Sequence, residues 1–138
     1  MKGANVKMLW YRLNKVRVLL SCFGVQCYDM KVDGDNLYIS CSVKIDGEQI
    51  RFKFPLNRLG WRFLRELERL DSCCFGGSVN PEDVRVLFVT LSTPDVIYRY
   101  RSRLRKVTGL VKDRKLRNWI IWRRITAPIR IAKKGDRS

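Results

Sequence analysis

Arginine side chains recur through the last third of the chain, where they could bind phosphate groups. Residues 96–138 hold 15 Lys or Arg and only two acidic residues, Asp113 and Asp136. Residues 1–95 hold 14 Lys or Arg and 11 acidic residues. A guanidinium group binds phosphate through paired hydrogen bonds, while Lys acts mainly as a point charge. A one-sign run lacks the mixed pairs that support exposed helices, so it favours a polyanionic partner. The alternative is a basic, solvated surface without a dedicated ligand.

The predicted nucleic-acid contacts are basic side chains in two helical segments. They are Arg99, Arg101, Arg103, Arg105, Lys106, Lys112, Arg114, Lys115, Arg117, Arg123 and Arg124. Contact of about six to ten such cations with phosphates would lower affinity ~10³–10⁵-fold between ~50 and ~200 mM salt. The sequence therefore predicts a DNA- or RNA-binding protein that contacts the phosphate backbone.

A second candidate surface lies beside Arg123 and Arg124. Trp119, Ile121 and Trp122 make this segment apolar almost all round, which indicates either burial or a partner surface. Trp and Arg are common in the energetic centres of protein interfaces. The alternative function is therefore a protein-interaction module, an inhibitor or assembly factor, that binds a nucleic-acid-handling complex or a second copy of the chain. Insertion at an anionic membrane surface is disfavoured.

Catalytic chemistry is disfavoured because the sequence contains no histidine. This excludes histidine general bases, Ser-His and Cys-His pairs and HExxH zinc sites. Most remaining acids lie at predicted turns, and Glu82 and Asp83 have no evident third ligand for a metal. We therefore predict no enzyme activity, no cofactor and no metal. A nuclease with a carboxylate-held metal is the competing hypothesis.

The five cysteines do not form a secreted disulfide framework, because their number is odd and their spacing irregular: Cys22, Cys27, Cys41, Cys73 and Cys74. Cys22, Cys27 and the Cys73-Cys74 pair could supply thiolates to zinc but lack the usual short spacing. We expect free thiols in a reducing compartment. Basic residues also interrupt any signal-peptide core. The predicted location is intracellular, in the cytoplasm or nucleus of a host cell.

The first half of the chain reads as a helix, three strands and a helix. Apolar residues at helical spacing predict a helix over 4–23 that stops at Gly24. Turn signals at Gly34-Asp35 and Asp46-Gly47 predict an antiparallel meander. Its register would pair Tyr28 with Cys41, Met30 with Ile39, Val32 with Leu37, Cys41 with Phe52, Val43 with Ile50, and Ile39 with Phe54.

The other face of this predicted sheet carries polar and basic residues that could contact nucleic acid. They are Lys31, Tyr38, Lys44, Arg51 and Lys53. Basic side chains around an aromatic ring can hold a backbone or stack a base. The alternative is the ordinary solvated face of a half-buried sheet.

A leucine-rich helix after Pro55 completes an α-β-β-β-α order over residues 4–71. This layout is similar to that of a double-stranded-RNA-binding domain. That family opens its second helix with a KKxAK-type cluster, where this chain has Pro55-Leu56-Asn57-Arg58. The family's Gly-Pro loop is replaced by Asp33-Gly34-Asp35-Asn36. The similarity is therefore one of element order.

The second half is predicted to add a strand and two basic helices. The apolar run Val84–Leu91 is typical of a strand covered on both faces, and would join the meander as a fourth strand. Thr93-Pro94-Asp95 is a helix-start signal, and Gly109 separates this helix from one that begins near Val111. Two basic helices joined through Gly109 could form a helix-turn-helix, although Arg105 stands where that motif needs a small residue.

The overall prediction is a single α+β domain with a mostly antiparallel four-stranded sheet. The domain would cover residues 1–127, with a sheet-and-helix core at 4–91, a basic helical region at 94–125 and a basic tail at 128–138. The composition also suits a virus- or mobile-element-encoded accessory protein.

Overall fold

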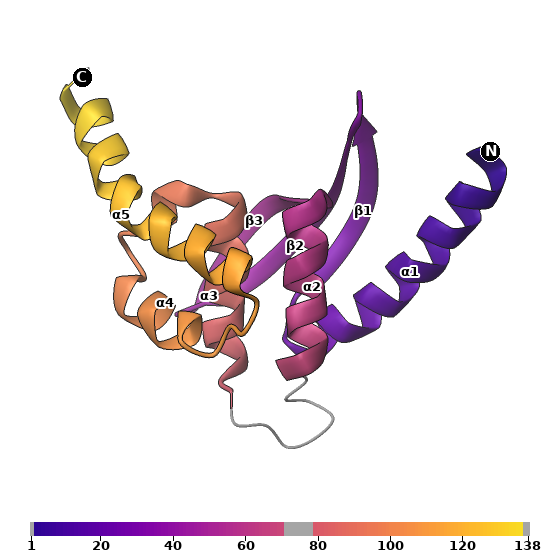
Figure 1. The fold of residues 1–138 in the computed structure, drawn as a ribbon, viewed down its shortest axis with the longest axis horizontal. Coiled ribbons are helices and arrows are strands. Elements are labelled where there is room, and N and C mark those ends of the chain that lie inside the picture. Colours follow the sequence, from indigo (N-terminus) through magenta and orange to yellow (C-terminus); the bar gives the residue numbers. More distant parts are fainter. Residues whose placement is uncertain (1, 71–78, 137–138) are drawn as a thin grey trace.

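The computed structural model describes the backbone of residues 2–70 and 79–136, and the side chains of 11–70 and 79–126. The elements follow the order α1 (Lys2–Cys22), β1 (Gln26–Asp33), β2 (Asn36–Ile45), β3 (Glu48–Pro55), α2 (Arg58–Leu70), α3 (Pro81–Ser92), a 3₁₀ turn η1 (Pro94–Val96), α4 (Arg101–Thr108) and α5 (Arg114–Asp136) (Figure 1). The predicted α+β class is confirmed.

The strands form a three-stranded antiparallel sheet of order β1-β2-β3. Figure 1 shows α2 and α3 side by side against this sheet, with α5 lying across α3 on the side away from the strands. The outer ends of α1 and α5 extend away from the body in different directions. The basic helices α4 and α5 pack beside α3, and their buried side chains Leu104, Val107, Leu116 and Ile120 join the core.

The two hairpins form at the predicted turns. Gly34 has a φ of 62° at the first turn, while Asp46 and Gly47 have φ values of 53° and 80° at the second. At the second turn both central residues therefore have positive φ, the type I′ geometry that matches the twist of paired strands. The pairs Met30–Ile39, Val32–Leu37, Ile39–Phe54, Cys41–Phe52 and Val43–Ile50 are all confirmed.

One predicted pair is wrong, because a β-bulge interrupts β1. The partner of Cys41 on β1 is Cys27, and the register shifts between Cys27 and Asp29. Tyr28 is the extra residue, and its side chain is 57% exposed instead of packing on the core face. A bulge of this kind places two residues opposite one and re-aims the inserted side chain.

Helix α1 ends as predicted. Leu13, Val16 and Leu20 are buried, and Gly24 adopts a φ of 81° beyond the last turn. The amide of Val25 donates to the carbonyl of Leu20 at 2.9 Å, which satisfies one of the free carbonyls at the helix end.

The residues Val84–Leu91 form a helix, so the predicted fourth strand is wrong. Asn80 caps α3 by accepting a hydrogen bond from the amide of Glu82 at 2.9 Å, and Pro81 occupies the first turn. Glu82 and Asp83 add negative charge near the positive end of the helix dipole. An apolar run without periodicity fits a buried helix as well as a buried strand. Here α3 packs against the sheet on one side and α4 on the other.

The two basic helices begin later than predicted. Thr93 donates its amide to Val89 and so ends α3, without any side-chain cap for the next segment. The predicted inward stripe of this segment is nevertheless buried, comprising Ile97, Tyr100, Leu104 and Val107. Asp113 starts α5 by accepting from the amide of Leu116 at 3.0 Å. That helix continues past Pro128 to Asp136, so most of residues 128–138 extend it.

The centre of the core is an aromatic cluster between the sheet, α2 and α3. The rings of Phe54 and Phe88 lie 4.4 Å apart, and Phe63 meets Phe88 edge-on at 4.7 Å. Such tilted contacts add to the area that the rings bury. In the part of the chain that the structure describes, no helix combines the length and apolar character needed to cross a bilayer.

Candidate nucleic-acid interface

Two of the predicted phosphate-binding arginines are held by carboxylates of the chain itself. Arg99 pairs with Glu48, and Arg103 contacts Asp46 at 2.8 Å and Glu82 at 2.6 Å. The hydrogen bond to Glu48 raises the pKa of Arg99. Asp46 lies in the β2–β3 turn and Glu48 begins β3, so these arginines attach the segment around α4 to the sheet. They are positioning residues more than free cations.

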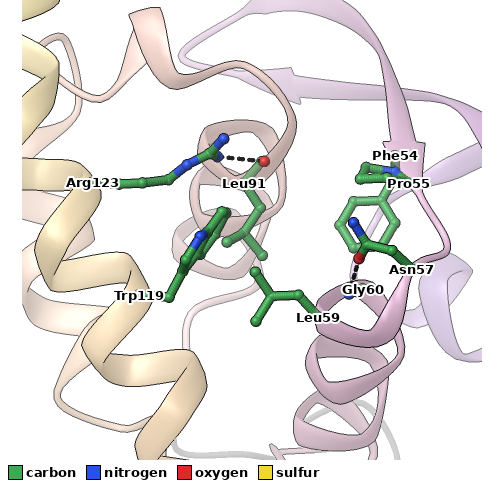
Figure 2. Close-up of a pocket in the computed structure, with 8 residues that line it drawn as sticks. All are labelled: Phe54, Pro55, Asn57, Leu59, Gly60, Leu91, Trp119 and Arg123. Atoms are coloured by element: carbon green, nitrogen blue, oxygen red, sulfur yellow. Dashed lines mark hydrogen bonds between the residues drawn. The ribbon is translucent and has the colours of Figure 1, made fainter.

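Arg123 also has an internal partner. Its Nη1 donates to the carbonyl oxygens of Thr90 (2.8 Å) and Leu91, near the carboxyl end of α3. A cation at this end of a helix satisfies free carbonyls and complements the dipole. Its guanidinium carbon lies 4.0 Å from the ring centre of Trp119 (Figure 2). Arg123 thus fastens α5 to α3.

Three other arginines gather where α4 meets α5, and we call Arg101, Arg105 and Arg124 the arginine cluster. Burial, and then the neighbouring charges of Arg105 and Arg101, lower the pKa of Arg124. Among the described residues, no carboxylate forms an ion pair with any of the three. Like charges held together in this way repel each other, and a bound anion would relieve the repulsion.

The remaining predicted cations extend this cluster along α5 and its preceding loop. Lys106, Lys112, Arg114 and Lys115 are exposed, and Arg117 is half-buried. On α5, Arg114, Arg117 and Arg124 are spaced so that they lie along one side of the helix. None of these five cations forms an ion pair with a carboxylate among the described residues. Three cations of α5 therefore share one side of that helix.

A buried carboxylate holds the α4–α5 loop in place. Glu66 on α2 accepts from the backbone amide of Lys112 at 2.8 Å and from Nε of Arg69 at 2.8 Å. Arg69 also donates to the carbonyl of Leu110. The start of α5 is thereby fixed to α2, and with it the direction in which its first cations project.

The structure separates the three residues of the predicted protein interface. Trp119 is partly buried and packs against the core, where Figure 2 shows it facing Leu59 and Leu91. These residues help to line a small pocket of about 100 Å³. Ile121 is half-buried. Trp122 alone is well exposed, at 53%.

The predicted sheet-face residues lie together on the face opposite the helices. Lys31 is opposite Tyr38, and Arg51 is opposite Ser42, as predicted. Tyr38 is half-buried, whereas the basic members of the set are exposed, namely Lys31, Lys44, Arg51 and Lys53. The bulge brings Tyr28 to this surface, with the guanidinium of Arg51 6.0 Å from its ring centre.

Sequence reasoning missed Tyr98 as part of the basic surface. This side chain is 59% exposed, and the guanidinium of Arg101 lies 5.8 Å from its ring centre. The sequence signal that could have indicated it is an aromatic residue three positions before an arginine at the start of a helix. Such a ring could stack a nucleic-acid base beside the arginine cluster.

The described residues contain no group of three or more Cys, Asp or Glu arranged to hold a metal ion. Cys73 and Cys74, which the zinc alternative requires, lie outside the described residues.

Comparison of the chain with protein-family models, curated proteins and solved structures gave no match.

Proposed function

We propose that this protein binds nucleic acid through the arginine cluster and the neighbouring cations of α4 and α5. The observation that carries the proposal is the gathering of Arg101, Arg105 and Arg124 without carboxylate partners among the described residues. If these arginines served solubility alone, there would be no physical reason to place three mutually repelling guanidinium groups close together. Phosphates spaced along a polymer would neutralise several of them at once.

The expected contacts differ in kind. Guanidinium groups of the cluster bind phosphate oxygens, and the exposed lysines add charge attraction without fixed geometry. Tyr98 provides an aromatic face beside Arg101. The binding is therefore led by the backbone of the nucleic acid and is non-catalytic, in an intracellular protein.

The first test compares a cluster variant with a charge-matched control. Replacing Arg101, Arg105 and Arg124 by Gln removes the same charge as replacing Arg12, Arg58 and Arg65, which are exposed on α1 and α2. Binding to single- and double-stranded DNA and RNA is measured by fluorescence anisotropy at several salt concentrations. The cluster variant should lose about three units of salt slope, since each phosphate contact contributes ~0.9.

The control variant should keep a slope close to that of the wild type. Equal losses in the two variants would mean that only total charge matters, and would contradict the proposed site. Circular dichroism of each variant verifies that the fold is retained.

A second candidate function is binding of a protein partner through α5. It is favoured by Trp122 and Ile125, which are 53% and 65% exposed and lie three positions apart on one side of the helix. Substitution Trp122→Ala distinguishes the two candidates. It should leave nucleic-acid affinity within about twofold if the arginine cluster carries the function, and should abolish partner binding under the alternative.

A further inference from the structure

Two cysteine side chains face each other across the β1–β2 ladder. Cys27 and Cys41 are directly paired, and their sulfur atoms lie 4.0 Å apart. Opposed residues in an antiparallel pair have Cα atoms ~4.5–5.5 Å apart, within the ~4.4–6.8 Å range of natural disulfides. Rotation of the two side chains can therefore bring the sulfurs to bonding distance without breaking the sheet.

The two thiols differ in access and in charge environment. Cys41 is buried, with 1% of its surface exposed, whereas Cys27 is half-buried. Cys27 lines two surface depressions, and Arg17 of α1 lines both of them. The hydrogen bond from Cys41, and then the charge of Arg17, lower the pKa of Cys27. The same hydrogen bond and burial raise the pKa of Cys41.

We propose that Cys27 and Cys41 form a reversible dithiol–disulfide pair in which a hydroperoxide oxidises Cys27 and Cys41 then closes the bond. An accessible thiolate beside an arginine, with a second thiol in reach, is the arrangement that favours such chemistry. Neither residue belongs to the basic surface of α4 and α5, so this inference is independent of the proposed function.

The reaction proceeds in two balanced steps. The Cys27 thiolate attacks one peroxide oxygen, a sulfur–oxygen bond forms, and the oxygen–oxygen bond breaks. The leaving oxygen takes a proton and departs as water or an alcohol, so the peroxide is reduced and Cys27 becomes a sulfenic acid. The Cys41 sulfur then attacks the Cys27 sulfur, and the hydroxide that leaves takes the Cys41 proton to form water.

Peptide mapping after oxidation tests the proposal. The reduced protein is freed of reductant, treated with hydrogen peroxide, blocked by alkylation and digested with trypsin without reduction. Cleavage after Arg17, Lys31 and Lys44 should yield the peptide 18–31 joined to the peptide 32–44. Thiol reductant should separate them again. The proposal is overturned if Cys27 or Cys41 remains unlinked, or if either pairs with Cys73, Cys74 or another molecule.

Three variants assign the roles within this cross-link. Because Cys22 shares the peptide of Cys27, Cys22→Ser should still form the bond, whereas Cys27→Ser should not. Cys41→Ala should leave a sulfenic acid at Cys27 that reacts with dimedone. A cross-link that depends on Cys22, or a folded Cys41→Ala protein without dimedone labelling, would reject the assignment.

The role of Arg17 is tested by the rate of peroxide reaction. Arg17→Gln should slow oxidation of Cys27 by several-fold, up to about tenfold if the pKa rises by one unit. Arg12→Gln removes another exposed charge from the same helix and should leave the rate unchanged. Equal rates for both variants would remove Arg17 from the proposed site.

Discussion

At the scale of single residues, the basic side chains of α4, α5 and the segments next to them fall into two groups with different roles. Arg99, Arg103 and Arg123 have internal partners and hold elements together. The arginine cluster and its neighbours have no such carboxylate partners in the described part of the chain. Formal charge alone therefore overstates the number of cations available to a ligand.

This division predicts different salt dependences for two single variants. Arg105→Gln should lower the slope of log affinity against log salt by about 0.9, because one phosphate contact is lost. Arg99→Gln should leave the slope unchanged, because its charge is already matched by Glu48. The measurement is a salt titration by anisotropy on one labelled oligonucleotide. A larger effect from Arg99 than from Arg105 would reverse the assignment.

The residue types in the sequence predicted the basic region, but not which of its arginines form ion pairs with carboxylates of the same chain. Glu48 and Asp46, which pair with Arg99 and Arg103, stand 51 and 57 residues earlier at the β2–β3 hairpin, and Glu82, the second partner of Arg103, lies on α3. Such long-range pairs depend on how α4 meets the sheet, which local spacing does not specify. Tyr28 shows the same limit, because no local signal marks the β-bulge that exposes it.

At the scale of elements, a close approach between α2 and β3 makes one glycine indispensable. A Cβ atom at Gly60 would overlap the carbonyl oxygen of Pro55. Gly60→Ala should therefore lower the free energy of unfolding by about 1–3 kcal/mol, as other overpacked substitutions do. Urea denaturation measures the change.

Gly109→Ala is the matched control for this prediction. A Cβ there would come no closer than 3.5 Å to the carbonyl of Lys106, and the residue has a helical φ of −62°. Alanine should raise the free energy of unfolding by about 0.4–1 kcal/mol, because it reduces the entropy of the unfolded chain. A loss at Gly109 as large as that at Gly60 would contradict the packing argument.

The α4–α5 loop should depend on the buried Glu66. Glu66→Ala leaves the amide of Lys112 and the guanidinium of Arg69 without this acceptor, which should cost about 2–3 kcal/mol of unfolding free energy. Glu68→Ala, on the exposed side of the same helix, should change it by less than about 0.5 kcal/mol. Thermal or urea unfolding compares the two. Similar values would show that Glu66 does not anchor the loop.

Element types were predictable where turn chemistry and periodicity agreed. The two hairpins and α1 meet both conditions. The register of the hairpins, apart from the bulge, and the end of α1 at Gly24 are therefore as predicted. The segment Val84–Leu91 has no periodicity, because α3 is covered on nearly all sides. Its start signal, Asn80 followed by Pro81 and two acids, distinguishes helix from strand better than its apolar interior.

At the scale of the whole molecule, the layers explain why the charge is one-sided. The centre of the core lies between the sheet, α2 and α3, and the helices α4 and α5 carry most of the net charge of +16. Because Leu104, Val107, Leu116 and Ile120 bury one side of these helices in the core, their other sides can present cations without disturbing it. The predicted α+β class is confirmed, with a three-stranded sheet in place of the predicted four strands.

The salt dependence of nucleic-acid binding by the wild-type protein tests the central claim most directly. With about six to eight cations on phosphates, the slope of log affinity against log salt should be about −5 to −7. Anisotropy with single- and double-stranded DNA and RNA between ~50 and ~300 mM salt measures this slope. A slope of this size for at least one form is the predicted result. An affinity that stays flat across that range, or no binding to any form, would contradict the account.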